Sequence, residues 1–76
     1  MEINSTNLVQ QSPPVLLTVS QFCEKHSFVS QGGLRFQIFN ASDNGLASIR
    51  AIVRMGRKVL IDEERYFQWV ESLRRR

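Results

Sequence analysis

Cysteine is almost missing from this sequence, which contains one, Cys23, among its 76 residues. A single cysteine cannot form a disulfide within the chain, and such sparing use is typical of proteins in a reducing cytosol. The sequence also lacks a long apolar run and a basic segment followed by an apolar one. It therefore predicts a cytoplasmic protein that is neither secreted nor spans a membrane.

The residue patterns of common catalytic and metal-binding sites are missing too. No pair of Cys or His stands at metal-ligand spacing, and no G-x-S-x-G motif is present. Gly56-Arg57-Lys58 lacks the upstream glycine and the following Ser or Thr of a phosphate loop. A core built from so short a chain leaves little room for a substrate cleft. We therefore expect no enzyme, and no metal, cofactor or small-molecule substrate.

Basic residues are scarce in the first half of the chain and frequent in the second. Lys25 and Arg35 precede Arg50, whereas the other eight Lys and Arg residues lie from Arg50 onward. The net charge of +3 and a pI of about 9.8 favour an acidic partner such as nucleic acid or an anionic membrane surface. A chain of this length forms one domain and buries only about 60% of its unfolded surface, so it gains from a partner.

The segment from Arg50 to Ile61 predicts a β-hairpin. Its strands are expected at about Ala51–Met55 and Lys58–Ile61, because β-branched residues favour a pleated surface and Gly56 permits a tight reversal. The basic residues in this segment are Arg50, Arg54, Arg57 and Lys58, with no acid among them. A cationic hairpin tip suits the phosphates of a polyanion, although the same charges would also serve a merely solvated hairpin.

Before the hairpin, the sequence predicts an N-terminal arm and a helix. Residues 1–14 are polar and end in Pro13-Pro14, which indicates a flexible arm; a minor-groove DNA arm is the alternative, but the segment has no Arg or Lys. Thr18 and Gln21 can form the capping box of the helix that follows. Cys23 is expected to be a small buried hydrophobe on this helix, and His26 a partly buried residue at its end.

A second helix is predicted at about Gln31–Asn40, with Ser30 as its N-cap. Its opening glycines, Gly32-Gly33, indicate either a phosphate-binding turn or a frayed one. Apolar residues lie on two opposite sides of this helix, which is therefore either clamped between elements or presents a hydrophobic patch. Leu34 and Ile38 form one side, Phe36 and Phe39 the other, and Gln31 and Arg35 lie at their border.

Residues 40–48 are predicted as a loop, and Asp62 as the N-cap of a last helix. One side of that helix is apolar and is expected to close the core. Base stacking by Tyr66 or Trp69 is the alternative, which the helical spacing disfavours. The apolar side comprises Tyr66, Phe67, Trp69, Val70 and Leu73.

Together these elements predict a mostly α-helical fold with a small β-hairpin, in a winged helix-turn-helix arrangement. Two helices joined by a short turn form a helix-turn-helix, and the basic hairpin after them is a wing. We expect an arm over residues 1–14, the domain over residues 15–73 and a basic tail over residues 74–76. The second helix would enter the major groove, and the wing would lie on the phosphate backbone or in the adjacent minor groove.

The motifs and their order resemble the excisionase and AlpA-like group of small winged helix-turn-helix proteins. This group is related in fold to the DNA-binding domain of MerR regulators and is common on prophages and integrative elements. The likeness rests on Leu16–Val19 and Val29–Ser30, which open two helices, then on Arg54–Glu63 and on an aromatic helix that ends in Trp69–Val70. A Leu-Arg-x-x-Ile-Phe-Asn-Ala run at Leu34–Ala41 is similar to uncharacterised phage-type members.

The resemblance implies sequence-specific binding of double-stranded DNA in the bacterial cytoplasm or nucleoid. The protein would direct an integrase toward excision, with further copies bound alongside on DNA, or would regulate transcription from a mobile-element promoter. Gln31 and Arg35 fall on the recognition helix of the group, and Arg54, Arg57 and Lys58 fall on its wing. Phe36 and Phe39 are unusually apolar for a groove-facing surface. The alternative is therefore a protein-interaction module that docks through them to an integrase, a regulator or a second copy.

Overall fold

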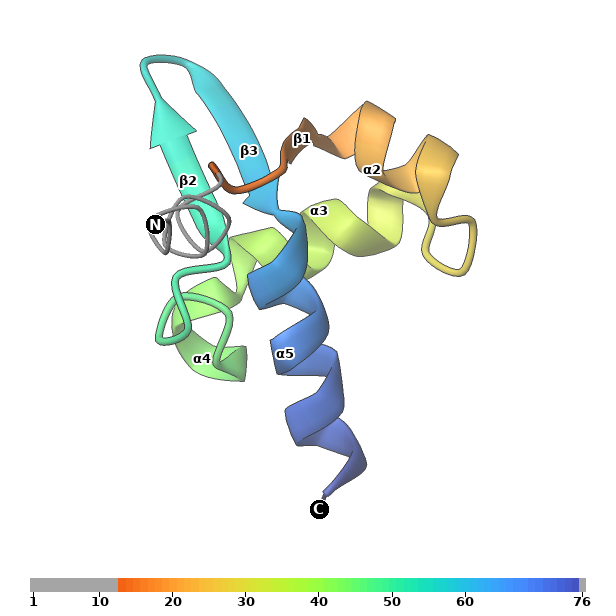
Figure 1. Cartoon of the computed structure of the whole chain (residues 1–76), viewed down its shortest axis with the longest axis vertical. Coiled ribbons are helices and arrows are strands. Elements are labelled where there is room, and N and C mark those ends of the chain that lie inside the picture. The colour runs from red at the N-terminus through yellow and green to blue at the C-terminus, as the bar shows by residue number, and fades with distance from the viewer. Residues whose placement is uncertain (1–12, 76) are drawn as a thin grey trace, which may run out of the picture.

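The computed structural model describes residues 13–75, in which helices combine with a three-stranded antiparallel sheet in a mixed α/β arrangement (Figure 1). The order of strands across the sheet is β1-β3-β2, so the last strand in the sequence lies in the centre. The elements in chain order are β1 (Leu16–Thr18), α2 (Val19–Lys25), α3 (Gln31–Phe39), α4 (Ala41–Asn44), β2 (Ile52–Met55), β3 (Lys58–Asp62) and α5 (Glu63–Arg74).

The predicted hairpin is confirmed as β2 and β3, which reverse direction around Gly56. This glycine has a φ of 61°, a left-handed conformation that a residue without a Cβ adopts at little cost. Figure 1 shows the hairpin reaching away from the helices to a free tip. The tip therefore lies outside the core, where its side chains are free to contact another molecule.

The prediction of a two-stranded sheet is wrong, because β1 adds a third strand on the other edge of β3. Leu17 of β1 and Ile52 of β2 both lie opposite Ile61, so these three side chains share one face of the sheet. Ile61 is buried, and the other two pack against the core beside it. A strand of three residues is too short to show an alternating pattern, which is why the sequence alone did not reveal it.

The predicted starts of α2, α3 and α5 are confirmed by their caps. Thr18 and Gln21 form the capping box at distances of 3.1 and 3.0 Å, and the Ser30 hydroxyl accepts a hydrogen bond of 3.0 Å from the Gly33 amide. Asp62 accepts one of 3.2 Å from the Arg65 amide. The first turn of α3 is thus capped by Ser30.

The prediction of a loop over residues 40–48 is wrong in part, because α4 occupies its first half. This short helix ends at Gly45, whose φ is 98°. The indole Nε1 of Trp69 donates a hydrogen bond of 2.7 Å to the carbonyl oxygen of Asn44. A contact from a residue 25 positions away thus satisfies a helix end that the local sequence leaves open.

The core lies between the sheet and the helices and is closed by α5. Tyr66 and Trp69 are buried, which confirms the predicted packing role and leaves neither ring available for base stacking in this conformation. Phe67 and Leu73, predicted on the same apolar side, are 36% and 40% exposed. The buried side of α5 is therefore narrower than its apolar stripe. The buried apolar side chains are Phe22, Leu34, Ile38, Ala41, Leu46, Ala51, Ile61, Tyr66 and Trp69.

We predict that Leu34→Ala lowers the free energy of unfolding by about 2–5 kcal/mol, because it leaves a cavity at a fully buried position. Phe36→Ala removes a larger side chain from the exposed side of the same helix and should change it by less than about 0.5 kcal/mol. Urea denaturation followed by circular dichroism compares the two. If both variants lost the same free energy of unfolding, Leu34 would not be buried more deeply than Phe36.

Candidate nucleic-acid interface

The basic side chains divide into a set that forms ion pairs and a set that does not. Among the Lys and Arg residues of the described part of the chain, Lys25 pairs with Glu63 at 2.9 Å, Arg65 with Asp62 and Arg74 with Glu71. Within residues 13–75, the cations outside these pairs are all exposed: Arg35, Arg50, Arg54, Arg57, Lys58 and Arg75. Five of these six are the basic residues that the sequence predicts as DNA contacts. Their charge is therefore available to an external anion.

The hairpin presents its cations on both faces and at its turn. Arg54 lies opposite Val59. Both residues are two positions from Ile52 and Ile61 along their strands, so they share the core-facing side of the sheet. Lys58 lies opposite Met55, which puts it on the outer side, and Arg57 follows Gly56 in the turn. Because Arg54 is exposed although it shares the core-facing side, it projects beyond the core toward the side of the sheet that the helices occupy.

Arg50 stands at the base of the hairpin in a strained backbone conformation that the sequence did not signal. Its φ of 62° costs a non-glycine residue roughly 1–2 kcal/mol. Hydrogen bonds on either side hold the segment, since the Arg50 amide donates to Ala47 and the Arg65 guanidinium to Ile49, both at 3.0 Å. The exposed Arg50 side chain thus leaves from a rigid position, separated from the hairpin tip by β2.

Helix α3 presents the remaining predicted site residues, Gln31 and Arg35, which are both exposed. Leu34 and Ile38, whose side of the helix borders these two residues, are buried. Phe36 and Phe39 are 70% and 86% exposed, so the helix displays a hydrophobic patch and is not clamped on both sides. Of the two alternatives for this helix, a clamped helix and an exposed hydrophobic patch, the structure has the exposed patch.

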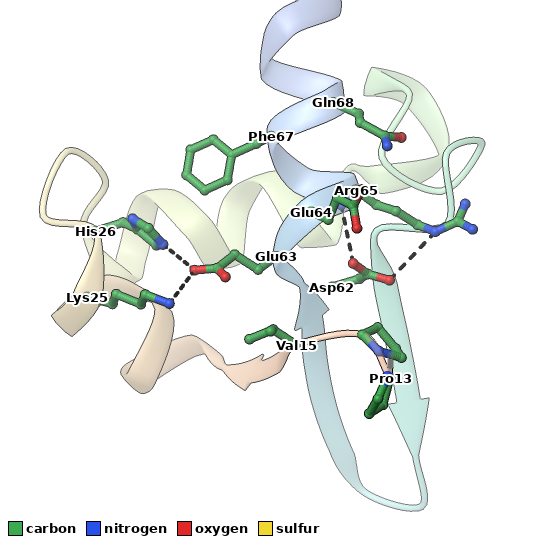
Figure 2. Close-up of a pocket in the computed structure, with 11 residues that line it drawn as sticks. Pro13, Val15, Lys25, His26, Asp62, Glu63, Glu64, Arg65, Phe67 and Gln68 are labelled. Atoms are coloured by element: carbon green, nitrogen blue, oxygen red, sulfur yellow. Dashed lines mark hydrogen bonds and ion pairs between the residues drawn. The ribbon is translucent and has the colours of Figure 1, made fainter. Parts of the chain in front are cut away.

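An open hollow of about 950 Å³ lies at the junction of α2 and α5, away from the predicted site residues. Figure 2 shows Lys25 and His26 pointing at the carboxylate of Glu63, with the Phe67 ring beside them. The Nζ of Lys25 and the Nε2 of His26 lie 2.9 and 2.6 Å from the same oxygen, Glu63 Oε2. Lys25 and His26 thus link α2 to the first turn of α5 through Glu63, and we call this group of three side chains the inter-helix joint. His26 is partly buried at the end of α2, as predicted.

Residues 13–75 contain neither a metal-binding cluster nor a helix that could cross a membrane. No three side chains of His, Cys, Asp or Glu come together in a way that could hold a metal ion. No helix of this part of the chain is long and apolar enough to cross a lipid bilayer.

Comparison with known proteins gives no relative from which a role could be transferred. No family model matches the chain, and neither the curated proteins nor the solved structures provide a match. A functional assignment therefore depends on the residues and the geometry described above.

We predict an acid-dependent loss of stability that depends on Glu63. Hydrogen bonds from His26 and from Lys25 hold the pKa of Glu63 below its usual value of 4.5. A carboxylate with a lowered pKa in the folded state stabilises it above its unfolded pKa, and this contribution disappears as the pH falls through the lowered value. The melting temperature of Glu63→Gln should therefore be lower than that of wild type at neutral pH. The two melting temperatures should converge well below pH 4.5.

The matched control is Glu71→Gln, which removes a carboxylate from an exposed pair near the other end of α5. Because exposed pairs contribute little, this variant should follow wild type across the pH range. If the melting temperature of Glu63→Gln stayed below that of wild type by the same amount down to low pH, the Glu63 carboxylate would not be the source of the acid-dependent loss.

Proposed function

We propose that this protein binds double-stranded DNA as a small winged helix-turn-helix protein, either a phage or mobile-element excisionase or a transcriptional regulator. In this proposal α2 and α3 are the helix-turn-helix, the β2–β3 hairpin is the wing, and α5 packs across the back. The observation that carries the proposal is the group of exposed cations on α3 and the hairpin that form no ion pair with any residue from 13 to 75. The resemblance to the excisionase and AlpA-like group points the same way.

The arrangement of the elements supports a common DNA-binding surface. Residues 27–29 lie between His26, the C-cap of α2, and Ser30, the N-cap of α3, so the connection is about as short as the turn of a helix-turn-helix. Arg54 shares the core-facing side of the sheet, and in this proposal the wing and α3 would contact one ligand together. B-DNA suits such a surface because its major groove admits a helix while the flanking phosphates accept cations.

The predicted residues then take distinct roles. Gln31 and Arg35 on α3 would contact base edges or phosphates, since the N-terminal half of a recognition helix enters the groove. The hairpin cations would contact phosphates, which positions the protein without reading the sequence. These phosphate contacts would be made by Arg50, Arg54, Arg57 and Lys58.

We predict that Arg57→Ala weakens binding to every duplex and reduces the slope of log affinity against log salt by about one unit. The loss of one phosphate contact releases about one counterion fewer. Fluorescence anisotropy with random-sequence duplex DNA at several salt concentrations measures both quantities.

Arg75→Ala is the matched control, because Arg75 is likewise exposed and outside the described ion pairs but lies at the end of α5, far from the hairpin (Figure 1). It should retain the wild-type slope. If Arg57→Ala behaved in the same way as Arg75→Ala, the hairpin would not be a phosphate-binding wing.

The exposure of Phe36 and Phe39 favours a second candidate function, a protein-interaction module of the same fold. Exposed aromatic side chains next to one another are frequent anchors of protein interfaces. The partner in this case would be an integrase, a regulator or a second copy of this chain.

For this second candidate we predict concentration-dependent self-association that Phe36→Ser abolishes, measured by sedimentation velocity over a wide range of protein concentration. Phe28→Ser is the matched control, since Phe28 is 62% exposed but lies in the turn before α3. A monomer at all concentrations, before and after substitution, would exclude a second copy as the partner.

A further inference from the structure

The outer face of α3 combines two bare aromatic rings with a cation, and we define it by Gly32, Arg35, Phe36 and Phe39. We propose that Phe36 and Phe39 contact the C5-methyl groups of thymine in the major groove. The protein would then recognise thymine through apolar contacts as well as through hydrogen bonds. This inference rests on the proposed function and names the base chemistry that the same site reads.

The fold itself does not account for the two phenylalanines. Leu34 and Ile38 already supply the contacts of α3 with the core. Phe36 and Phe39 are 70% and 86% exposed, and they are three residues apart, so they are neighbours on the helix surface. Each leaves an apolar ring in water, and covering the rings would be favourable. A surface of this kind is best explained by what it binds.

The charge around the two rings selects an anionic ligand. Helix α3 contains no acidic residue, and its one charged side chain, Arg35, is next to Phe36 in the sequence. Arg35 is exposed and forms no ion pair within residues 13–75. The hairpin adds further cations of the same kind. Arg35 and the hairpin cations thus favour a ligand with negative charge beside the part that covers the rings, and the two phosphate backbones on either side of the major groove supply such charge.

Within the major groove, the thymine methyl is the apolar group that a base pair presents. Phenylalanine is among the side chains that contact it, while Arg reads guanine and Gln reads adenine by hydrogen bonds. The outer face of α3 and the adjacent Gln31 thus hold side chains for both kinds of contact.

Gly32 is consistent with a close approach of the helix to DNA. A Cβ built at Gly32 would meet nothing within 4 Å, and its φ is not in the left-handed region. Neither packing nor backbone conformation in this protein therefore calls for glycine at this position. Because Gly32 has no side chain, nothing projects from the outer face at its N-terminal end. The α3 backbone can therefore come near the base edges there.

The test compares two duplexes that differ only in the methyl group, alternating poly(dA-dT) and alternating poly(dA-dU). Wild-type protein should bind the thymine polymer more tightly by about fourfold for each methyl group covered, from the free energy of burying one such group. The preference should be reduced in Phe36→Ala and in Phe39→Ala and lost when both are replaced. Phe28→Ala should keep the wild-type preference, because Phe28 lies outside the outer face.

A second pair of polymers separates the methyl group from other properties of A·T sequences. Alternating poly(dG-dC) with 5-methylcytosine places the same methyl in the major groove, so it should bind more tightly than the unmethylated polymer, again through Phe36 and Phe39.

The outcomes distinguish this inference from the proposed function. Equal binding to both members of each pair, with a steep salt dependence, would overturn the methyl contact and leave DNA binding intact. A methyl preference that survives replacement of both phenylalanines would also overturn it. The absence of binding to any duplex at low salt, from protein with a wild-type circular dichroism spectrum, would overturn both proposals and leave the two rings to a protein partner.

Discussion

Tyr66 and Trp69 each bury an aromatic ring in the core and place a polar atom on an acceptor from another element. The Tyr66 hydroxyl donates to Gln37 of α3 at 2.7 Å, and the Trp69 indole donates to the carbonyl of Asn44 at the end of α4. Such residues supply a large apolar area and a directional hydrogen bond at once. The position of α5 against α3 and α4 depends on this pair, and so does the direction in which α3 presents its outer face.

The small size of the chain makes this arrangement demanding. A domain of this length has few side chains to bury, and its net stability is a small difference between large opposing terms. Phe36 and Phe39 nevertheless remain outside, although two buried phenylalanines would add substantially to a core of this size. The outer face of α3 therefore forgoes stability that the chain could have used, which is typical of a surface kept for binding.

The charged residues also divide between the scaffold and the proposed binding surface. The acids Asp62 and Glu63 lie where β3 ends and α5 begins; one caps the helix and the other joins it to Lys25 and His26. Glu71 pairs with Arg74 along α5. These acids are used inside the scaffold, while the hairpin and α3 keep cations that have no acid beside them among the described residues. The modest net charge of +3 is thus spread unevenly, and it is concentrated where we propose DNA to bind.

By itself, the sequence determined the features that depend on residues close together in the chain. The caps at Thr18, Ser30 and Asp62, the reversal at Gly56 and the two opposite sides of α3 all follow from interactions over about four residues. Tertiary structure alone decided what depends on distant partners. It added β1 to the free edge of β3, formed α4 beneath Trp69, and joined His26 to Glu63, which is 37 positions away. It also left Phe67 partly exposed, because the packing of α5 covers only part of its apolar stripe. Local preferences act before the chain is packed, whereas these contacts exist only once distant segments have met.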